Sequence, residues 1–154
     1  MGVRGKLSAE FEIKSQPESY FKRLKEELHH LPDAASAVHG VEVHEGDFKT
    51  HGSVKSWSYT IGGKKETFKE RFEIDEANWT VSMVAVGGHI LQRYKSYRII
   101  YMVVQAATIN EAPTVKVTLA YEKYKETDVD PHKEMEFLIT MNGDIDKHLL
   151  TGHQ

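Results

Sequence analysis

The strongest constraint on how this chain folds is a period-two alternation of apolar and polar residues through its long middle part. Such alternation is typical of β-strands that bury one face. Turn-forming residues divide the stretch into segments, and they stand at residues 45–47, 61–63, 75–78, 87–88 and 110–113. Because these connections are short and carry no helical pattern, they predict an antiparallel meander and exclude an alternating parallel α/β sheet.

Residues of one parity in each predicted strand are apolar and share a face, because successive side chains of a strand point to opposite sides. One face of the sheet should therefore be rich in aromatic side chains. We expect on it Trp57 and Tyr59; Phe68, Phe72 and Ile74; Trp79, Val81, Met83 and Ala85; Tyr97, Ile99, Tyr101 and Val103; and Val115, Val117, Leu119 and Tyr121.

Helical patterns stand on both sides of this meander. After a first strand over residues 6–13, Pro17 precedes residues 18–31, whose apolar side chains recur every three or four positions. That spacing predicts one or two short helices with one buried face, and Pro32 is expected to end them.

Residues 135–150 predict a long C-terminal helix that packs on the sheet, with Leu138, Met141, Ile145 and Leu149 along its apolar face. Gly143 lies in the middle of this helix and costs about 1 kcal/mol of helix propensity relative to Ala. It indicates either a close approach of another backbone or a locally soft helix, and we favour close packing.

Together these elements predict one α+β domain that spans residues 1–154. A chain of this length buries about 70% of its unfolded surface, so its stability requires neither a metal nor a disulfide. The sequence shows no internal repeat, low-complexity tract or interdomain linker.

Charge and cysteine content narrow the partners. Lys and Arg number 20 against 23 Asp and Glu, with no long run of either sign, which argues against a nucleic-acid partner. The absence of cysteine fits a reducing compartment, so we expect a cytoplasmic protein. No stretch approaches the ~20 apolar residues of a membrane span. We expect a monomer by default.

Familiar catalytic and metal motifs are weak here. The nine histidines include no pair at helical i, i+4 spacing with a carboxylate, so we expect no metal site. Residues 46–53 contain glycines and a lysine, but a phosphate loop opens a helix, whereas the residues from Gly52 onward open a strand. No Ser-His-Asp arrangement or cofactor motif can be nominated, and we expect neither catalytic residues nor a cofactor.

A family likeness runs in order along nearly the whole chain. The motifs are residues 45–47 (EGD), 51–59 (HGSVKSWSY), 69–70 (KE), 94–97 (YKSY), 121–123 (YEK), 130–131 (DP) and 148–150 (HLL). With these motifs the chain resembles the plant major latex protein-like branch of the Bet v 1, or pathogenesis-related class 10, superfamily. The resemblance implies a helix-grip fold, in which a seven-stranded curved antiparallel sheet wraps around the long C-terminal helix, with two short helices after the first strand.

The resemblance also implies a hydrophobic cavity between helix and sheet, although a fully packed core would explain the same apolar residues. It favours non-enzymatic binding or carriage of amphipathic small molecules, such as lipids, steroids or hormones, with a role in plant defence or stress. The residues that we expect to line the site are Tyr20, Leu24, Trp57, Tyr59, Phe68, Glu70, Phe72, Trp79, Val81, Met83, Tyr97, Ile99, Tyr101, Val117, Leu119, Phe137, Leu138, Met141 and Ile145.

Glu70 is the most informative of these residues, because its parity places a carboxylate on the apolar face with Phe68 and Phe72. A buried carboxylate needs a hydroxyl, a cation, water or a proton as partner. It could then be a polar handle for a ligand head group. The alternative is a β-bulge that turns Glu70 out to solvent.

Two other functions remain open. Some superfamily members are reported as ribonucleases, which would use Lys55 with Glu70 or Asp146 here, but Lys95 occupies one of the acidic positions of the family pattern. A missing carboxylate weakens an acid-base scheme. A third possibility is a ligand-dependent interaction module, in which the family's glycine-rich loop, here residues 46–53, contacts a protein partner. This loop has fewer glycines than that of the allergens.

Overall fold

The computed structural model describes residues 3–152; residues 1, 2, 153 and 154 lie outside the described part. The described chain runs through β1 (Val3–Glu12), α1 (Pro17–Glu26), the 3-10 helix η1 (Leu28–His30), α2 (Leu31–Ala34), β2 (Val38–Glu45), β3 (Val54–Ile61), β4 (Lys64–Asp75), β5 (Thr80–Gly88), α3 (Ile90–Arg93), β6 (Tyr94–Val104), β7 (Thr114–Lys123) and α4 (His132–Leu150). None of the described helices combines the length and apolarity that crossing a membrane requires.

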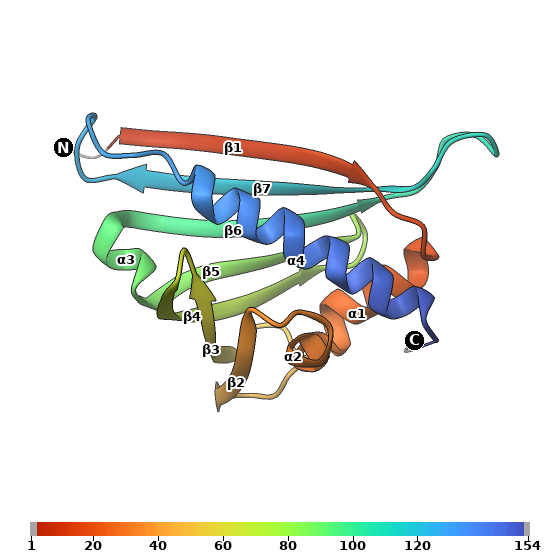
Figure 1. Cartoon of the computed structure of the whole chain (residues 1–154), viewed down its shortest axis with the longest axis horizontal. Helices are drawn as coiled ribbons and strands as arrows, with labels where there is room; N and C mark the ends of the chain where they lie inside the picture. Colours follow the sequence, from red (N-terminus) through yellow and green to blue (C-terminus); the bar gives the residue numbers. More distant parts are fainter. Residues whose placement is uncertain (1–2, 153–154) are drawn as a thin grey trace.

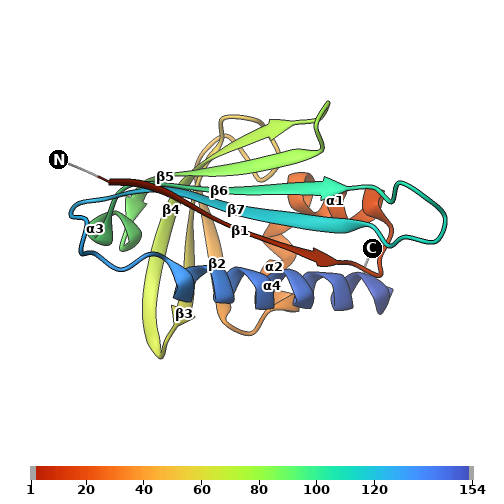
Figure 2. The ribbon, with the colours of Figure 1, turned by 90° about the horizontal axis from the view of Figure 1, so that it is seen from above.

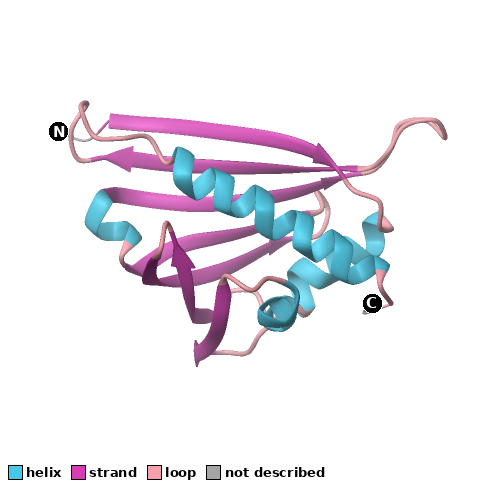
Figure 3. Ribbon diagram, viewed as in Figure 1, coloured by secondary structure: helices cyan, strands magenta, loops and turns pink. Residues whose placement is uncertain are grey.

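The strands form one seven-stranded antiparallel sheet in the order β1-β7-β6-β5-β4-β3-β2. Figure 1 shows α4 crossing one face of this sheet, with α1 and α2 beside its C-terminal half. In Figure 2 the sheet curls so that β2, β3 and β4 turn toward α4. Figure 3 shows α4 in front of the sheet and the one-turn helix α3 at the ends of β5 and β6. The predicted curved sheet around a C-terminal helix is confirmed.

Alternation along the strands produces the core. In β1 every second side chain turns inward, so Leu7 lies opposite Leu119 of β7 and Phe11 lies opposite Val115. The inner face of β6 is buried in the same way from Tyr97 to Val103. Parity alone therefore explains which side chains meet α4.

Two glycines permit close contacts at the ends of strands. A side chain on Gly5 would have its Cβ 2.7 Å from the ring of Tyr121, so the tyrosine lies flat over the glycine. Gly88 has φ +94 and its Cβ would come within 2.3 Å of the Thr67 carbonyl oxygen. Only glycine has both the backbone freedom and the small size that this position needs.

The expected short helices before β2 are present as α1 and α2, with the 3-10 helix η1 between them. The helical segment runs to Ala34, past its expected end at residue 31. The expectation that Pro32 ends the segment is wrong: it lies in the first turn of α2. A proline is tolerated there because backbone N–H groups in the first turn of a helix have no acceptor within the helix, so the missing N–H of proline breaks no hydrogen bond.

Gly143 is not at a close backbone contact, contrary to our expectation. No atom outside its own helix and chain neighbours lies within 4 Å of the position that a Cβ would occupy. The α4 helix begins at His132, three residues before the predicted start at residue 135.

Two further features differ from the sequence prediction. Trp79 precedes β5, lies in a turn with φ 51, and stacks on Phe21 of α1 with ring centroids 5.3 Å apart. The pair Gly87 and Gly88 leads into the one-turn helix α3 and not into a simple hairpin. A helix of four residues is too short to show a hydrophobic period.

Candidate functional site

A narrow cavity lies between the concave face of the sheet and α4. Its volume is about 70 Å³, whereas typical small-molecule sites have roughly 300–1,000 Å³. Its wall is almost wholly apolar and includes two carboxylates, Glu70 and Glu134. The lining residues are Leu28, Leu31, Val38, Trp57, Tyr59, Ile61, Phe68, Glu70, Met83, Ile90, Tyr97, Ile99, Tyr101, Glu134, Phe137, Leu138 and Met141.

The cavity brings together many of the residues expected at a ligand site, although their contact with a ligand stays a prediction. Those on its wall are Trp57, Tyr59, Phe68, Glu70, Met83, Tyr97, Ile99, Tyr101, Phe137, Leu138 and Met141. The expected residues that are not on its wall are Tyr20, Leu24, Phe72, Trp79, Val81, Val117, Leu119 and Ile145. All of these except Trp79 are buried in the surrounding core. They lie outside the cavity because α1 and α4 pack directly on β5, β6 and β7 and fill that end of the interior.

Sequence reasoning missed six wall residues, namely Leu28, Leu31, Val38, Ile61, Ile90 and Glu134. Ile61 continues the parity of Trp57 and Tyr59, so the strand pattern could have identified it. Leu28 and Leu31 belonged to the helical stripe already recognised. Ile90 and Glu134 follow a turn and a loop, and no periodic signal could have placed them at the cavity.

Glu70 points inward and is fully buried, so the inward alternative was the correct one. A register shift does occur between Lys69 and Glu70 in the β4–β5 pairing, yet the carboxylate stays on the inner face. Trp57 Nε1 donates a hydrogen bond to Glu70 Oε1. Within residues 3–152, Oε2 has no hydrogen-bond partner. Burial raises the pKa of this carboxyl to about 7, although the positive charge of Lys55 acts to lower it.

Lys55 lies opposite Glu70 in the β3–β4 register and is 1% exposed. Its Nζ donates a hydrogen bond to the Phe48 carbonyl oxygen at 3.2 Å and lies 4.0 Å from the centre of the Phe72 ring. Burial lowers the pKa of this amine, and the charge of Glu70 opposes that shift. The interior thus holds a cation and a carboxylate on neighbouring strands.

Tyrosine hydroxyls add polar groups next to the cavity. Tyr101 is almost completely buried on the wall. Burial raises the pKa of its hydroxyl, a side-chain hydrogen bond with Asn142 acts to lower it, and the Glu70 charge adds to the rise. Tyr20 of α1 also reaches Asn142 of α4, because its hydroxyl donates to Asn142 Oδ1 at 2.6 Å.

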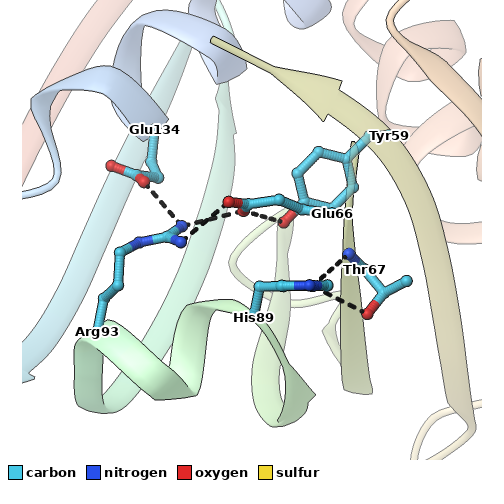
Figure 4. Close-up of polar contacts among 6 residues, drawn as sticks. All are labelled: Tyr59, Glu66, Thr67, His89, Arg93 and Glu134. Atoms are coloured by element: carbon cyan, nitrogen blue, oxygen red, sulfur yellow. Dashed lines mark hydrogen bonds and ion pairs between the residues drawn. The ribbon is translucent and has the colours of Figure 1, made fainter. Parts of the chain in front are cut away.

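A cluster of charged side chains adjoins the cavity wall at Glu134. Figure 4 shows Arg93 between Glu66 and Glu134: Nη1 and Nη2 lie 2.9 and 3.0 Å from the two Glu66 oxygens, and Nη2 lies 3.1 Å from Glu134 Oε2. Tyr59 Oη is 3.5 Å from Glu66 Oε1. Burial acts to raise the pKa of the Glu66 carboxyl, but the hydrogen bond and charge of Arg93 outweigh it and lower the pKa below its usual value.

A second hollow is a surface groove of about 340 Å³ between α4 and the strands β2 and β3. Four of its lining residues, Val38, Ile61, Phe137 and Met141, also line the cavity. A single layer of side chains therefore separates the groove from the interior. Lys133, Glu136 and Asp144 also line this groove and make its wall partly polar.

The loop of residues 46–53 is held by its own hydrogen bonds. Asp47 Oδ1 accepts from the backbone N–H groups of Lys49 and Thr50 at 2.9 and 2.7 Å. Phe48 stacks on His29 of η1, with ring centroids 4.4 Å apart. This loop therefore covers the end of the interior where Lys55 lies.

Residues 3–152 contain no group of three or more His, Asp or Glu side chains placed to hold a metal ion. Three histidines bond to nearby strand residues instead. His39 Nε2 lies 2.6 Å from the Thr60 hydroxyl, and His44 Nε2 lies 2.8 Å from the Ser56 hydroxyl. His51 Nδ1 accepts a hydrogen bond from the backbone of Ile74 at 3.0 Å.

Asp146 is engaged away from the cavity. Its oxygens accept hydrogen bonds from the backbone N–H groups of Lys14 and Ser15 at 2.9 and 3.0 Å, and from the Ser15 hydroxyl at 2.5 Å. Asp146 thus ties the connection between β1 and α1 to α4. This structural role differs from the acid-base role considered from the sequence.

Comparison with known proteins identifies the family to which the chain belongs. The model of the "Pathogenesis-related protein Bet v 1 family" matches residues 2–152, so the chain belongs to this family. MLP-like protein 328 of Arabidopsis thaliana is 34% identical over 151 residues, which cover 97% of this chain and 99% of that protein. The predicted likeness to major latex proteins is confirmed.

Solved structures agree with this assignment. Major latex-like protein 151 of Panax ginseng superposes with a TM-score of 0.88 at 32% identity, covering 96% of this chain and 98% of that one. Norcoclaurine synthase from Thalictrum flavum superposes with a TM-score of 0.79 at 21% identity, covering 97% and 88%. The second likeness shows the fold alone. Because this fold also occurs in a synthase, it does not by itself separate binding from catalysis.

Proposed function

We propose that this protein binds and carries amphipathic or hydrophobic small molecules of lipid-, steroid- or hormone-like character, without changing them chemically. Membership of the Bet v 1 family supports a ligand-binding fold. The observation that carries the proposal is Glu70 Oε2, a fully buried oxygen on the cavity wall without a hydrogen-bond partner in residues 3–152. An unpaired buried polar atom is costly. A ligand hydroxyl or amine that donates to it would remove that cost.

The cavity must widen to hold such a ligand, because its volume of about 70 Å³ has room for only a few water molecules. The groove offers the space, because Phe137 and Met141 belong to both walls. Met is unbranched and has three rotatable bonds, so it repacks at low cost. Displacement of these two side chains would join the cavity to the groove.

The direct test is native mass spectrometry of protein purified gently from its source, followed by denaturing extraction and identification of the released molecule. A stoichiometric amphipathic adduct supports the proposal and gives the chemical class of the ligand. A second test measures affinity for primary alcohols of increasing chain length by calorimetry. Each buried CH₂ should add about 0.8 kcal/mol until the site is full. A flat series, together with protein that carries no adduct, would contradict the proposal.

Catalysis is the second candidate, and the adjacency of Lys55 and Glu70 in the interior favours considering it. Asp146 does not join this pair, because it holds Ser15. If the chain hydrolyses RNA with Lys55, activity in nuclease-free preparations should disappear in the Lys55→Ala variant. Activity that persists in that variant would identify a contaminant.

A role in plant defence or stress is consistent with the family description, which names pathogenesis-related proteins. We propose that the protein acts as a cytoplasmic monomer, and that loaded protein presents the loop of residues 46–53 to a protein partner. Light scattering of the purified chain tests the monomer. Pull-downs with loaded and empty protein separate a partner module from a passive carrier, because only the module should retain a partner in a ligand-dependent way.

A further inference from the structure

A cluster of ion-paired side chains links the cavity wall to the solvent-exposed surface. The Glu134 side chain lines the cavity and is 11% exposed, while Arg93, which it contacts, is 35% exposed. Arg93 also binds Glu66, whose side chain is 7% exposed. Figure 4 shows this ion-paired cluster of Glu66, Arg93 and Glu134.

The cluster joins elements that are far apart in the sequence. Glu66 is on β4, Arg93 ends α3 and Glu134 lies in the first turn of α4. The one-turn helix α3 packs on β5 and β6, so the Arg93–Glu134 contact is a side-chain link from α3 to α4. His89 Nδ1 accepts a hydrogen bond from the Thr67 backbone at 3.0 Å and attaches the start of α3 to β4.

The two carboxylates hold Arg93 unequally. Glu66 makes two contacts to the guanidinium and Glu134 makes one. A two-pronged contact fixes the orientation of a guanidinium better than a single one does. The link to α4 should therefore break first and leave Arg93 attached to β4.

We propose that Arg93 is a latch on the cavity: its contact with Glu134 closes the cavity, and release of that contact opens a route for ligand between the interior and solvent. Charged contacts at partly exposed positions are screened by water and individually weak. Such a contact breaks and reforms without unfolding the domain. The Arg93 latch presupposes the binding function proposed above.

The test is the kinetics of a neutral fluorescent probe, N-phenyl-1-naphthylamine, measured by stopped-flow mixing. A latch that is closed in both the free and the loaded protein changes only the kinetic barrier to ligand entry and exit, and not the relative free energies of the two states. We therefore expect Arg93→Gln to raise the association and dissociation rate constants by the same factor, roughly tenfold, which corresponds to about 1.4 kcal/mol of barrier. Its equilibrium Kd should stay within about twofold of the wild-type value, because Arg93 does not line the cavity. Glu134→Gln should raise the dissociation rate constant as well.

Salt provides a second readout on the same samples. Raising the ionic strength from 0.01 to 1 M shortens the Debye length from about 30 to 3 Å and weakens exposed ion pairs. Probe exchange in the wild-type protein should become faster with salt. Exchange in Arg93→Gln should show little further dependence, because its latch is already absent.

Arg98 provides the matched control. Its Nη1 lies 3.1 Å from Glu73 Oε1, and the two side chains are 42% and 30% exposed, but this ion pair lies on the outer face of the sheet. Arg98→Gln should leave both rate constants unchanged. The double variant Glu66→Gln/Arg93→Gln avoids leaving the Glu66 carboxylate, whose side chain is 7% exposed, without its partner, so it remains informative if Arg93→Gln unfolds. Circular dichroism verifies the fold of each variant.

The outcomes separate the latch from the binding function. If the wild-type protein shows no saturable probe binding, the proposed function fails and the latch fails with it. If the probe binds but exchanges at the same rates in wild type, Glu134→Gln and the double variant, the latch alone is overturned. If only the dissociation rate rises in Arg93→Gln and its Kd weakens in proportion, Arg93 and Glu134 act as ligand contacts and not as a latch.

Discussion

One of the two Glu70 carboxylate oxygens makes no hydrogen bond within residues 3–152. Trp57 satisfies one oxygen, while the other faces an apolar wall without a partner in the described residues. Its two protonation states offer a ligand different chemistry. The ionised carboxylate only accepts hydrogen bonds, whereas the neutral carboxyl group can also donate one. The pH dependence of binding should therefore show whether the polar group of the ligand donates a hydrogen bond to Glu70 or accepts one from it.

We expect binding of a long-chain alcohol to tighten as pH rises. Burial holds the pKa of Glu70 near 7, so the carboxylate is mostly neutral at pH 6 and mostly ionised at pH 8. A hydroxyl donor prefers the ionised form. If only that form binds, the apparent Kd falls about tenfold between pH 6 and pH 8. Isothermal titration calorimetry at several pH values measures this change.

Glu70→Gln should flatten this profile, because the amide carbonyl still accepts from Trp57 but does not titrate. Glu134→Gln is the matched control, since Glu134 also lines the cavity but is already bound to Arg93. It should keep the profile of the wild type. A profile that is unchanged in Glu70→Gln would show that another group titrates.

Two glycines should respond in opposite ways to the same added methyl group. Gly143 in α4 faces open space, so Gly143→Ala should stabilise the fold by about 1 kcal/mol through helix propensity. Gly88 has φ +94 and would bring a Cβ to 2.3 Å from the Thr67 carbonyl oxygen, so Gly88→Ala should destabilise it by about 3 kcal/mol. Urea unfolding measures both. A destabilised Gly143→Ala would show that α4 needs flexibility there.

At the scale of elements, the two halves of α4 have different roles. Its N-terminal half lines the cavity through Glu134, Phe137 and Leu138. Its C-terminal half is joined to α1 by the hydrogen bond from Tyr20 to Asn142, and to the β1–α1 connection by Asp146. The C-terminal half is thus anchored in a packed core, whereas the N-terminal half covers a space.

Asp146 should matter for stability and not for chemistry. Asp146→Ala leaves two backbone N–H groups and the Ser15 hydroxyl without their acceptor, and we expect a loss of about 3 kcal/mol. Asp144→Ala, a change on the same helix at the groove, is the control and should cost far less. Thermal unfolding distinguishes the two variants. Full stability with lost RNA hydrolysis in Asp146→Ala would favour the ribonuclease alternative instead.

At the scale of the whole molecule, a curved sheet held against one helix leaves room that side chains do not fill. A ligand that binds only the folded state at 100 times its Kd should stabilise it by about 2.7 kcal/mol. For a domain of this size that corresponds to a rise in Tm of about 5–10 °C. Differential scanning calorimetry with and without the native ligand measures it. An unchanged Tm at saturation would contradict specific binding to the fold.

The sequence was sufficient for the strands, because a period of two is a local property of each segment. It placed Trp57 and Tyr101 on the inner face, and the structure agrees, whereas it left Glu70 open between the inner face and a bulge. It did not anticipate that Trp79 lies in the turn before β5 with φ 51, although its side chain still packs on the core. It also missed Ile90, which reaches the cavity from a helix too short to have a period.

By itself, then, the sequence determined the order of the strands and of the long C-terminal helix, the buried face of the strands and the family, since these depend on spacing along the chain. Only the tertiary structure decided that Glu70 keeps an unpaired oxygen, that Asp146 holds Ser15, and that Arg93 pairs with both Glu66 and Glu134. These contacts join residues from separate elements. Their distances depend on how far the sheet curls around α4, and local patterning does not encode that curvature.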